Sequence, residues 1–174
     1  MRLTAVLGTV LSIGVTAAFF ATPAGARTSG KASFRGQIIA INQNGSRKVV
    51  SSIIVAKGPF NGAGTIVEIP NRPGDPENVV RDDLVFPGGT LHIRTTNQTP
   101  RFSADPQTCA VTATIRQRTR IVGGTGRFRA ASGTFSARLR AWGVAGRNAD
   151  GTCNMQGDLL IDGDAISARG TLSF

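Results

Sequence analysis

The sequence predicts an all-β protein whose strands close into an antiparallel barrel of about eight strands, and three observations support this. Apolar and polar residues alternate with a period of two over long runs, without the 3.6-residue period of a helix. Asx-Gly and Gly-Gly pairs interrupt these runs at short intervals and supply the positive φ of tight hairpins. Roughly eight or nine short strands in one small domain favour closure, because a closed sheet has no exposed edge. A two-sheet sandwich is the alternative.

Residues 1–26 read as a secretory signal. Arg2 gives a positive start, an apolar run follows from residue 3 to residue 20, and Ala24-Gly25-Ala26 has the small-residue pattern of a cleavage site. The alternative is a retained membrane anchor, because the apolar run is nearly long enough to span a bilayer. The first interpretation predicts a secreted protein with a single barrel domain at residues 27–174.

Cys109 and Cys153 are the only cysteines of the chain. An even number of cysteines in an exported protein usually forms disulfides, so we expect these two to be bonded to each other. The bridge would close a loop of about 44 residues and stabilise the fold by about 3–4 kcal/mol. Two unpaired buried thiols are the alternative.

The clearest predicted strands lie in the second half of the chain. Each has one apolar face opposite a polar face, which is typical of an antiparallel sheet covered on one side. The four apolar faces are Cys109, Val111, Ala113 and Ile115; Phe135, Ala137, Leu139 and Ala141; Cys153, Met155, Gly157, Leu159 and Ile161; and Ile166, Ala168, Gly170, Leu172 and Phe174.

The first half of the chain gives less regular strand candidates, at residues 33–41, 48–57, 64–69, 78–86 and 90–95. Glycine-containing turn signals separate the predicted strands along the whole chain. These signals are Asn44-Gly45, Asn61-Gly62, Pro73-Gly74-Asp75, Pro87-Gly88-Gly89, Asp150-Gly151 and Asp162-Gly163.

A further glycine-rich segment, Gly123-Gly124-Thr125-Gly126, is followed by Arg127 and Phe128. Three glycines in four residues allow left-handed φ and close backbone approach, and Phe128 can fold back over the barrel end. An anion-binding loop is the alternative, but no Lys-Ser/Thr pair and no helical pattern follow the glycines. We therefore interpret the segment as a structural turn.

Residues 121–133, which contain this turn, resemble a signature of the allene oxide cyclase and dirigent superfamily. In that signature a strand ends in Gly-Gly-Thr-Gly, a basic and an aromatic residue follow, and small residues with glycine begin the next strand. The resemblance implies an eight-stranded antiparallel barrel with a central hydrophobic cavity, often assembled into dimers or trimers. It carries over no catalytic residue.

Few residues of the sequence suit catalysis. His92 is the only histidine and is expected on the outer face of its strand, away from the barrel interior. Glu68 is the one candidate for a buried catalytic acid, because it can share the inward face of Ile66. We expect no metal and no cofactor.

Two pairs of aspartates could act as acid and base. Asp82 and Asp83 are adjacent, so on a strand their side chains point to opposite faces. Asp162 and Asp164 flank Gly163 and are interpreted as hairpin-turn residues. The predicted inward faces then contain almost nothing that titrates.

Such an interior would hold an apolar molecule but has little with which to transform it. A solidly packed barrel is the alternative, since eight strands leave an interior that side chains can fill. The candidates for lining a cavity are Val111, Ile115, Phe135, Leu139, Met155 and Leu159.

The chain has a formal net charge of +10, and residues 106–149 contain eight arginines and no acidic residue. If the glycine turn joins two antiparallel strands, their arginines stand together on the outer face and could bind phosphate, carboxylate or sulfate groups. A merely solubilising basic face is the alternative. Nucleic acid is not expected as a partner, because aromatic side chains that could stack on bases are scarce. The expected partners are envelope polyanions or anionic lipids. The stripe comprises Arg116, Arg118, Arg120, Arg138 and Arg140, with Arg127 and Arg129 nearby.

Three functions follow from these expectations. The first is a secreted barrel that binds a small apolar or amphipathic ligand without turning it over. The second, implied by the resemblance, is a cyclase, isomerase or dirigent-like protein that steers a reactive intermediate. The third is a polyanion-binding module. Two Asn-x-Ser/Thr glycosylation patterns, at Asn44 and Asn97, lie in predicted turns.

Overall fold

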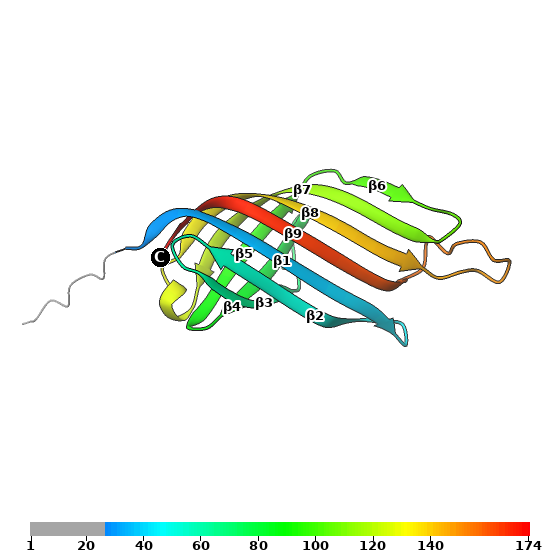
Figure 1. Ribbon diagram of the computed structural model, residues 1–174, viewed down its shortest axis with the longest axis horizontal. Coiled ribbons are helices and arrows are strands. Elements are labelled where there is room, and N and C mark those ends of the chain that lie inside the picture. Colours follow the sequence, from blue (N-terminus) through cyan, green and yellow to red (C-terminus); the bar gives the residue numbers. More distant parts are fainter. Residues whose placement is uncertain (1–26) are drawn as a thin grey trace, which may run out of the picture.

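The computed structural model describes residues 27–174, and these form the predicted closed, eight-stranded antiparallel barrel (Figure 1). The predicted signal segment, residues 1–26, lies outside the described residues. Within residues 27–174 no helix is long and apolar enough to cross a membrane. The strands are β1 (Ser29–Gln43), β2 (Ser46–Lys57), β3 (Gly62–Ile69), β4 (Val79–Phe86), β5 (Gly89–Asn97), β6 (Arg101–Ala104), β7 (Ala110–Gly124), β8 (Ser132–Ala145) and β9 (Leu159–Ser173).

The barrel closes through two pairings that are not between consecutive strands. β1 pairs with β9, and β5 pairs with the second half of β7, so that the ring order is β1-β2-β3-β4-β5-β7-β8-β9. The short β6 pairs with the first half of β7 and lies outside the ring, and the sequence pattern did not predict it. The long strands β1, β2, β7, β8 and β9 extend beyond β3, β4 and β5 at one end, where they form a lip (Figure 1).

Two of the predicted turns form tight two-residue hairpin loops between neighbouring strands. Asn44 and Gly45 both have positive φ, at 55° and 78°, and connect β1 to β2. Gly88 and Gly89 connect β4 to β5, also with positive φ. These are conformations that glycine, and to a lesser extent asparagine, adopts at low cost.

The prediction of a hairpin at Asp162-Gly163 is wrong. β9 runs unbroken through these residues, and Gly163 lies directly opposite Trp142 on β8. A Cβ at Gly163 would lie 2.5 Å from the indole ring of Trp142, so the glycine makes room for an aromatic side chain rather than for a turn. The strand predicted from Cys153 to Ile161 is also wrong in its first part, because β9 begins only at Leu159. Before that residue Cys153 makes only an isolated bridge, to Arg147.

The predicted disulfide is confirmed. Cys109 immediately precedes β7, and Cys153 lies in the connection between β8 and β9. The bond fastens this long connection to the start of β7 at the lip end of the barrel. It therefore restrains a segment that has little regular secondary structure of its own.

Phenylalanine side chains close the opposite end of the barrel. The glycine-rich segment leaves β7 and enters a short 3-10 turn, η1 (Gly126–Phe128), which folds Phe128 back into the interior. Phe128 is completely buried, and its ring centroid lies 4.9 Å from that of Phe60 and 5.1 Å from that of Phe174. Gly126 has a φ of 55°, and a Cβ there would lie 2.2 Å from the carbonyl oxygen of Gly88. The segment is thus a tight structural turn.

Candidate functional site

The middle of the barrel contains a cavity of about 160 Å³. Its walls are mostly aliphatic, because the inward positions of the strands carry branched apolar side chains. Phe34 and Phe135 pack edge to face, 5.0 Å apart, and separate the cavity from the phenylalanine cluster at the closed end. The other apolar residues that line it include Ile38, Ile54, Ile66, Leu84, Ile93, Ile121, Leu139 and Ile166.

Three carboxylates line the same cavity, Glu68 on β3, Asp82 on β4 and Asp164 on β9. Glu68 and Asp82 are direct partners in the β3–β4 register, so their side chains share the inward face. The expectation that almost nothing in the interior titrates is therefore wrong. Asp164, interpreted from the sequence as a turn residue, is an inward residue of a continuous strand.

The strand period explains why these acids point inward. Asp82 lies two residues before the buried Leu84, and Asp164 lies two residues before Ile166, which is partly buried against the core. In the sequence, the inward direction of Asp82 and Asp164 was indicated by their position among the apolar residues that alternate along each strand. As predicted from adjacency, Asp83 points to the opposite face from Asp82.

Burial raises the pKa of Asp82 to about 6, and the negative charges of Glu68, Asp83 and Asp164 contribute to this rise. Burial also raises the pKa of Asp164, with Asp162 and Glu68 adding to the effect and Arg47 opposing it. Within residues 27–174 neither Asp82 nor Asp164 forms an ion pair. The cavity thus has an apolar body and one end whose carboxylates accept hydrogen bonds and attract positive charge.

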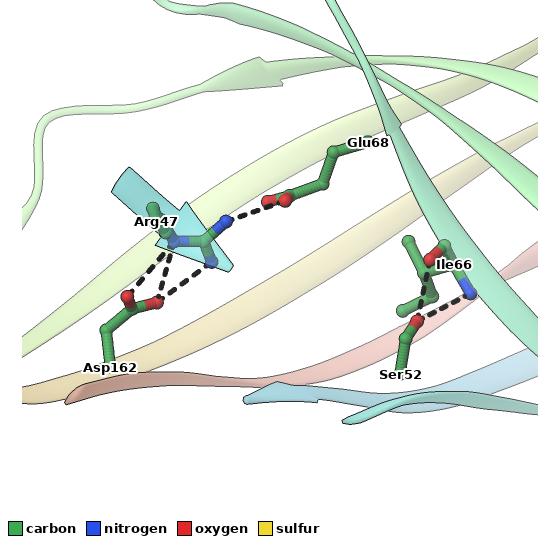
Figure 2. A network of polar contacts seen from close by, with 5 residues as sticks. All are labelled: Arg47, Ser52, Ile66, Glu68 and Asp162. Atoms are coloured by element: carbon green, nitrogen blue, oxygen red, sulfur yellow. Dashed lines mark hydrogen bonds and ion pairs between the residues drawn. The ribbon is translucent and has the colours of Figure 1, made fainter. Parts of the chain in front are cut away.

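Arg47 organises the rim beside this acidic end (Figure 2). Its Nη1 donates to Glu68 Oε2 at 2.7 Å, and its Nε and Nη2 donate to Asp162 at 3.0 and 2.8 Å. These contacts, led by the hydrogen bond to Asp162, raise the pKa of Arg47 above its usual range. One guanidinium therefore joins β2, β3 and β9 and holds Glu68 at the mouth, where its side chain is 45% exposed.

Ser52 links β2 to β3 in the barrel wall next to this rim (Figure 2). Its Oγ accepts a hydrogen bond from the backbone N–H of Ile66 at 2.9 Å and donates one to the carbonyl of Ile66 at 2.6 Å. The β2–β3 ladder covers only residues 54–56 of β2, so the serine replaces backbone pairing where the two strands diverge.

Neutral polar groups line the cavity on β5 and β7. The hydroxyls of Thr95 and Thr119 are hydrogen-bonded at 2.9 Å, and Gln117 Nε2 donates to Asn97 Oδ1 at 2.8 Å. Asn97 was predicted in a turn as a glycosylation pattern, but it is the last residue of β5 and its side chain faces the cavity. Asn44, the other such position, lies in an exposed turn.

The structure places the predicted cavity-lining residues in different surroundings. Phe135 and Leu139 line the cavity. Val111 and Leu159 line a groove of the lip that adjoins the cavity, with which it shares Glu68 and Asp164. The other two predicted residues, Ile115 and Met155, line neither the cavity nor the groove. Ile115 lies opposite Leu139 on the inward face but does not line the cavity, and Met155 is 45% exposed in a loop.

His92 lies outside the cavity, as expected for an outer-face residue. Its Nδ1 is 2.6 Å from Asp83 Oδ1 on the outside of the sheet. Within residues 27–174 no group of three or more histidine, cysteine, aspartate or glutamate side chains is arranged to hold a metal ion.

The predicted arginine stripe lies on the outside of β7 and β8. Arg116, Arg118 and Arg120 are exposed on β7, and Arg138 and Arg140 are exposed on β8. The nearby Arg127 points elsewhere, since its guanidinium lies over the rings of Phe60 and Phe128 at the closed end of the barrel.

No family model matches the chain, and neither does any curated protein or solved structure.

Proposed function

We propose that the protein is an exported barrel that binds a small amphipathic molecule in its cavity without transforming it. The apolar body of the ligand lies among the aliphatic walls, and a hydrogen-bond-donating or cationic group faces Glu68, Asp82 and Asp164. The observation that carries this proposal is the cavity itself, with apolar walls and a carboxylate end. The disulfide supports export, because such bonds persist in oxidising compartments.

The dimensions of the cavity limit the size of the ligand. A volume of about 160 Å³ is much smaller than a drug-sized pocket and similar to cavities that hold a single benzene ring. The ligand is therefore a single ring or a short chain. Ionised carboxylates accept hydrogen bonds but donate none, so they favour amines and alcohols and repel anions.

Benzylamine, benzyl alcohol and benzoate form a matched set of probes for this proposal. We expect benzylamine to bind most tightly at pH 7.5, benzyl alcohol to bind more weakly, and benzoate to bind at least about tenfold more weakly than the amine. Binding of the amine should weaken as the pH falls through 6, where Asp82 takes up a proton. Titrations followed by NMR chemical shifts of cavity methyl groups measure these affinities.

The control for the site is a pair of identical substitutions on neighbouring strands. Ala137→Leu adds bulk to the cavity wall, whereas Ala165→Leu adds it to the exposed face of β9. The first should weaken benzylamine binding by about tenfold or more and the second should leave it unchanged. Equal binding by both variants, or equal binding of the three probes, would contradict a cavity site.

Asp82 favours a second candidate, the cyclase- or isomerase-like function that the family resemblance implies. A carboxyl with a pKa near 6 can both give and take a proton near neutral pH. If the barrel catalyses such a step, Asp82→Asn should abolish turnover, and the wild-type rate should change around pH 6. Turnover of an epoxide or quinone-methide probe that is equal in Asp82→Asn and wild type would exclude this role for Asp82.

A further inference from the structure

The outer face of the barrel carries a set of exposed arginines on four adjacent strands. We call this set the arginine face, and it consists of Arg35 on β1, Arg116, Arg118 and Arg120 on β7, Arg138 on β8 and Arg169 on β9. Five of the six, all but Arg120, line a single shallow hollow of the surface.

Strand register places these side chains in two parallel rows. In one row Arg116 lies opposite Arg138, and Ser167 then separates Arg138 from Arg35. In the neighbouring row the order across the same four strands is Arg118, Ser136, Arg169 and Ser33. Because adjacent strands are about 4.8 Å apart, each row spans roughly 15 Å.

The positive charge of this face is not compensated by the protein. Within residues 27–174 none of the six arginines forms an ion pair, whereas Arg47 and Arg81 both do. Arg116 and Arg138 are like charges directly opposite each other, an arrangement that destabilises a sheet. The fold gains no ion pair from this arrangement, and an anion lying across the rows would relieve the repulsion.

We propose that the arginine face binds an anionic polysaccharide that lies across β7, β8, β9 and β1. Guanidinium groups form paired hydrogen bonds with sulfate and carboxylate groups, and the rows present several of them at regular spacing. The serines between the arginines supply donors and acceptors for sugar hydroxyls. The repeated acidic groups of a linear polymer match the repeated positive groups of the sheet.

Other anionic surfaces match the face less well. The two rows contain only arginine and serine, so they have no aromatic side chain on which bases of a single strand could stack. They also lack the apolar residues that surface-bound proteins insert into a bilayer. Exposed aliphatic side chains such as Val55, Ile53 and Val67 begin at the edge of this face, where Val55 on β2 lies opposite Arg35, and continue around the ring onto β3, so that none stands within the two rows.

The test compares two double variants with the same loss of charge. Arg116→Gln with Arg138→Gln removes the opposed pair, whereas Lys48→Gln with Arg72→Gln removes two exposed charges elsewhere. Calorimetric titration with dextran sulfate and with polygalacturonate should show binding to the wild type that weakens steeply with salt. The first variant should bind about tenfold or more weakly with a shallower salt dependence, and the second should bind like the wild type.

Three results would overturn the proposal. They are equal losses in the two double variants, equal binding of neutral dextran, and tighter binding of anionic lipid vesicles or single-stranded RNA than of either polysaccharide. Melting curves of both variants should show that they are folded. Benzylamine titration of Arg116→Gln with Arg138→Gln separates this proposal from the cavity function, because the interior site should be unaffected.

Discussion

Phe128→Ala should lower the free energy of unfolding by about 3–5 kcal/mol, the range for truncating a fully buried phenylalanine. Phe128 is 0% exposed and packs against the rings of Phe60, Phe86 and Phe174. Its position depends on the turn at Gly126, which folds it over the end of the barrel. The substitution therefore leaves a cavity where three aromatic rings converge.

Urea unfolding with the disulfide intact measures this effect. Phe102→Ala is the matched control, because Phe102 on the outlying β6 is 65% exposed and its truncation should change stability by about 0.5 kcal/mol or less. A loss below about 1 kcal/mol for Phe128→Ala would show that the phenylalanine cluster does not close the barrel. If the variant is too unstable to purify, Phe128→Leu should give a smaller loss in the same direction.

Local signals in the sequence were sufficient for most of the strands and for two tight hairpins of the barrel. The alternation along residues 109–120 set the inward face of β7, and the glycines at Asn44-Gly45 and Gly88-Gly89 marked two hairpins. Both depend on neighbours within a few residues. The pairing of β1 with β9 and of β5 with β7 is not local, and it followed only from the general argument that closure removes edges.

Predictions failed where a residue's role depends on a distant neighbour. Gly163 follows an aspartate, as turn glycines often do, but the ring of Trp142 on the adjacent strand requires it in mid-strand. Met155 has the alternation of a strand residue, yet the connection to which it belongs is held by the disulfide from Cys153 to Cys109 rather than by a ladder. Both Trp142 and Cys109 are far in the sequence from the residues whose surroundings they decide.

The acidic end of the cavity was missed for a related reason. Asp82 and Asp164 share the apolar phase of their strands, but nearby acidic residues, Asp83 and Asp162, suggested turns or solvent instead. Register brings Glu68 opposite Asp82, and Arg47 then fixes the rim. Only the closed sheet shows that carboxylates from three strands meet in one cavity.

Asp82→Asn should raise the free energy of unfolding at pH 7 by as much as about 3 kcal/mol. The pKa of Asp82 is raised from its ordinary 3.8 to about 6 in the folded protein, chiefly by burial. A tenfold change in proton affinity corresponds to about 1.4 kcal/mol, so the roughly hundredfold higher affinity of the folded state sets this upper limit. Between pH 3.8 and 6 the folded state holds a proton that the unfolded chain has released, so this carboxyl lowers stability as the pH rises.

The difference in unfolding free energy between Asp82→Asn and wild type should therefore depend on pH. It should be largest above pH 6 and should shrink steadily below it, toward a small value at pH 3.5, where most of the unfolded chains also hold this proton. Urea unfolding at fixed ionic strength between about pH 3.5 and 7.5 measures it. Glu77→Gln is the control, because Glu77 is exposed in the loop before β4, forms no ion pair within residues 27–174 and is not among the charges that act on Asp82, so its removal should change stability by about 0.5 kcal/mol or less at every pH. A difference that does not vary with pH would mean that Asp82 is solvated, and the cavity would then lack the carboxyl on which ligand selectivity depends.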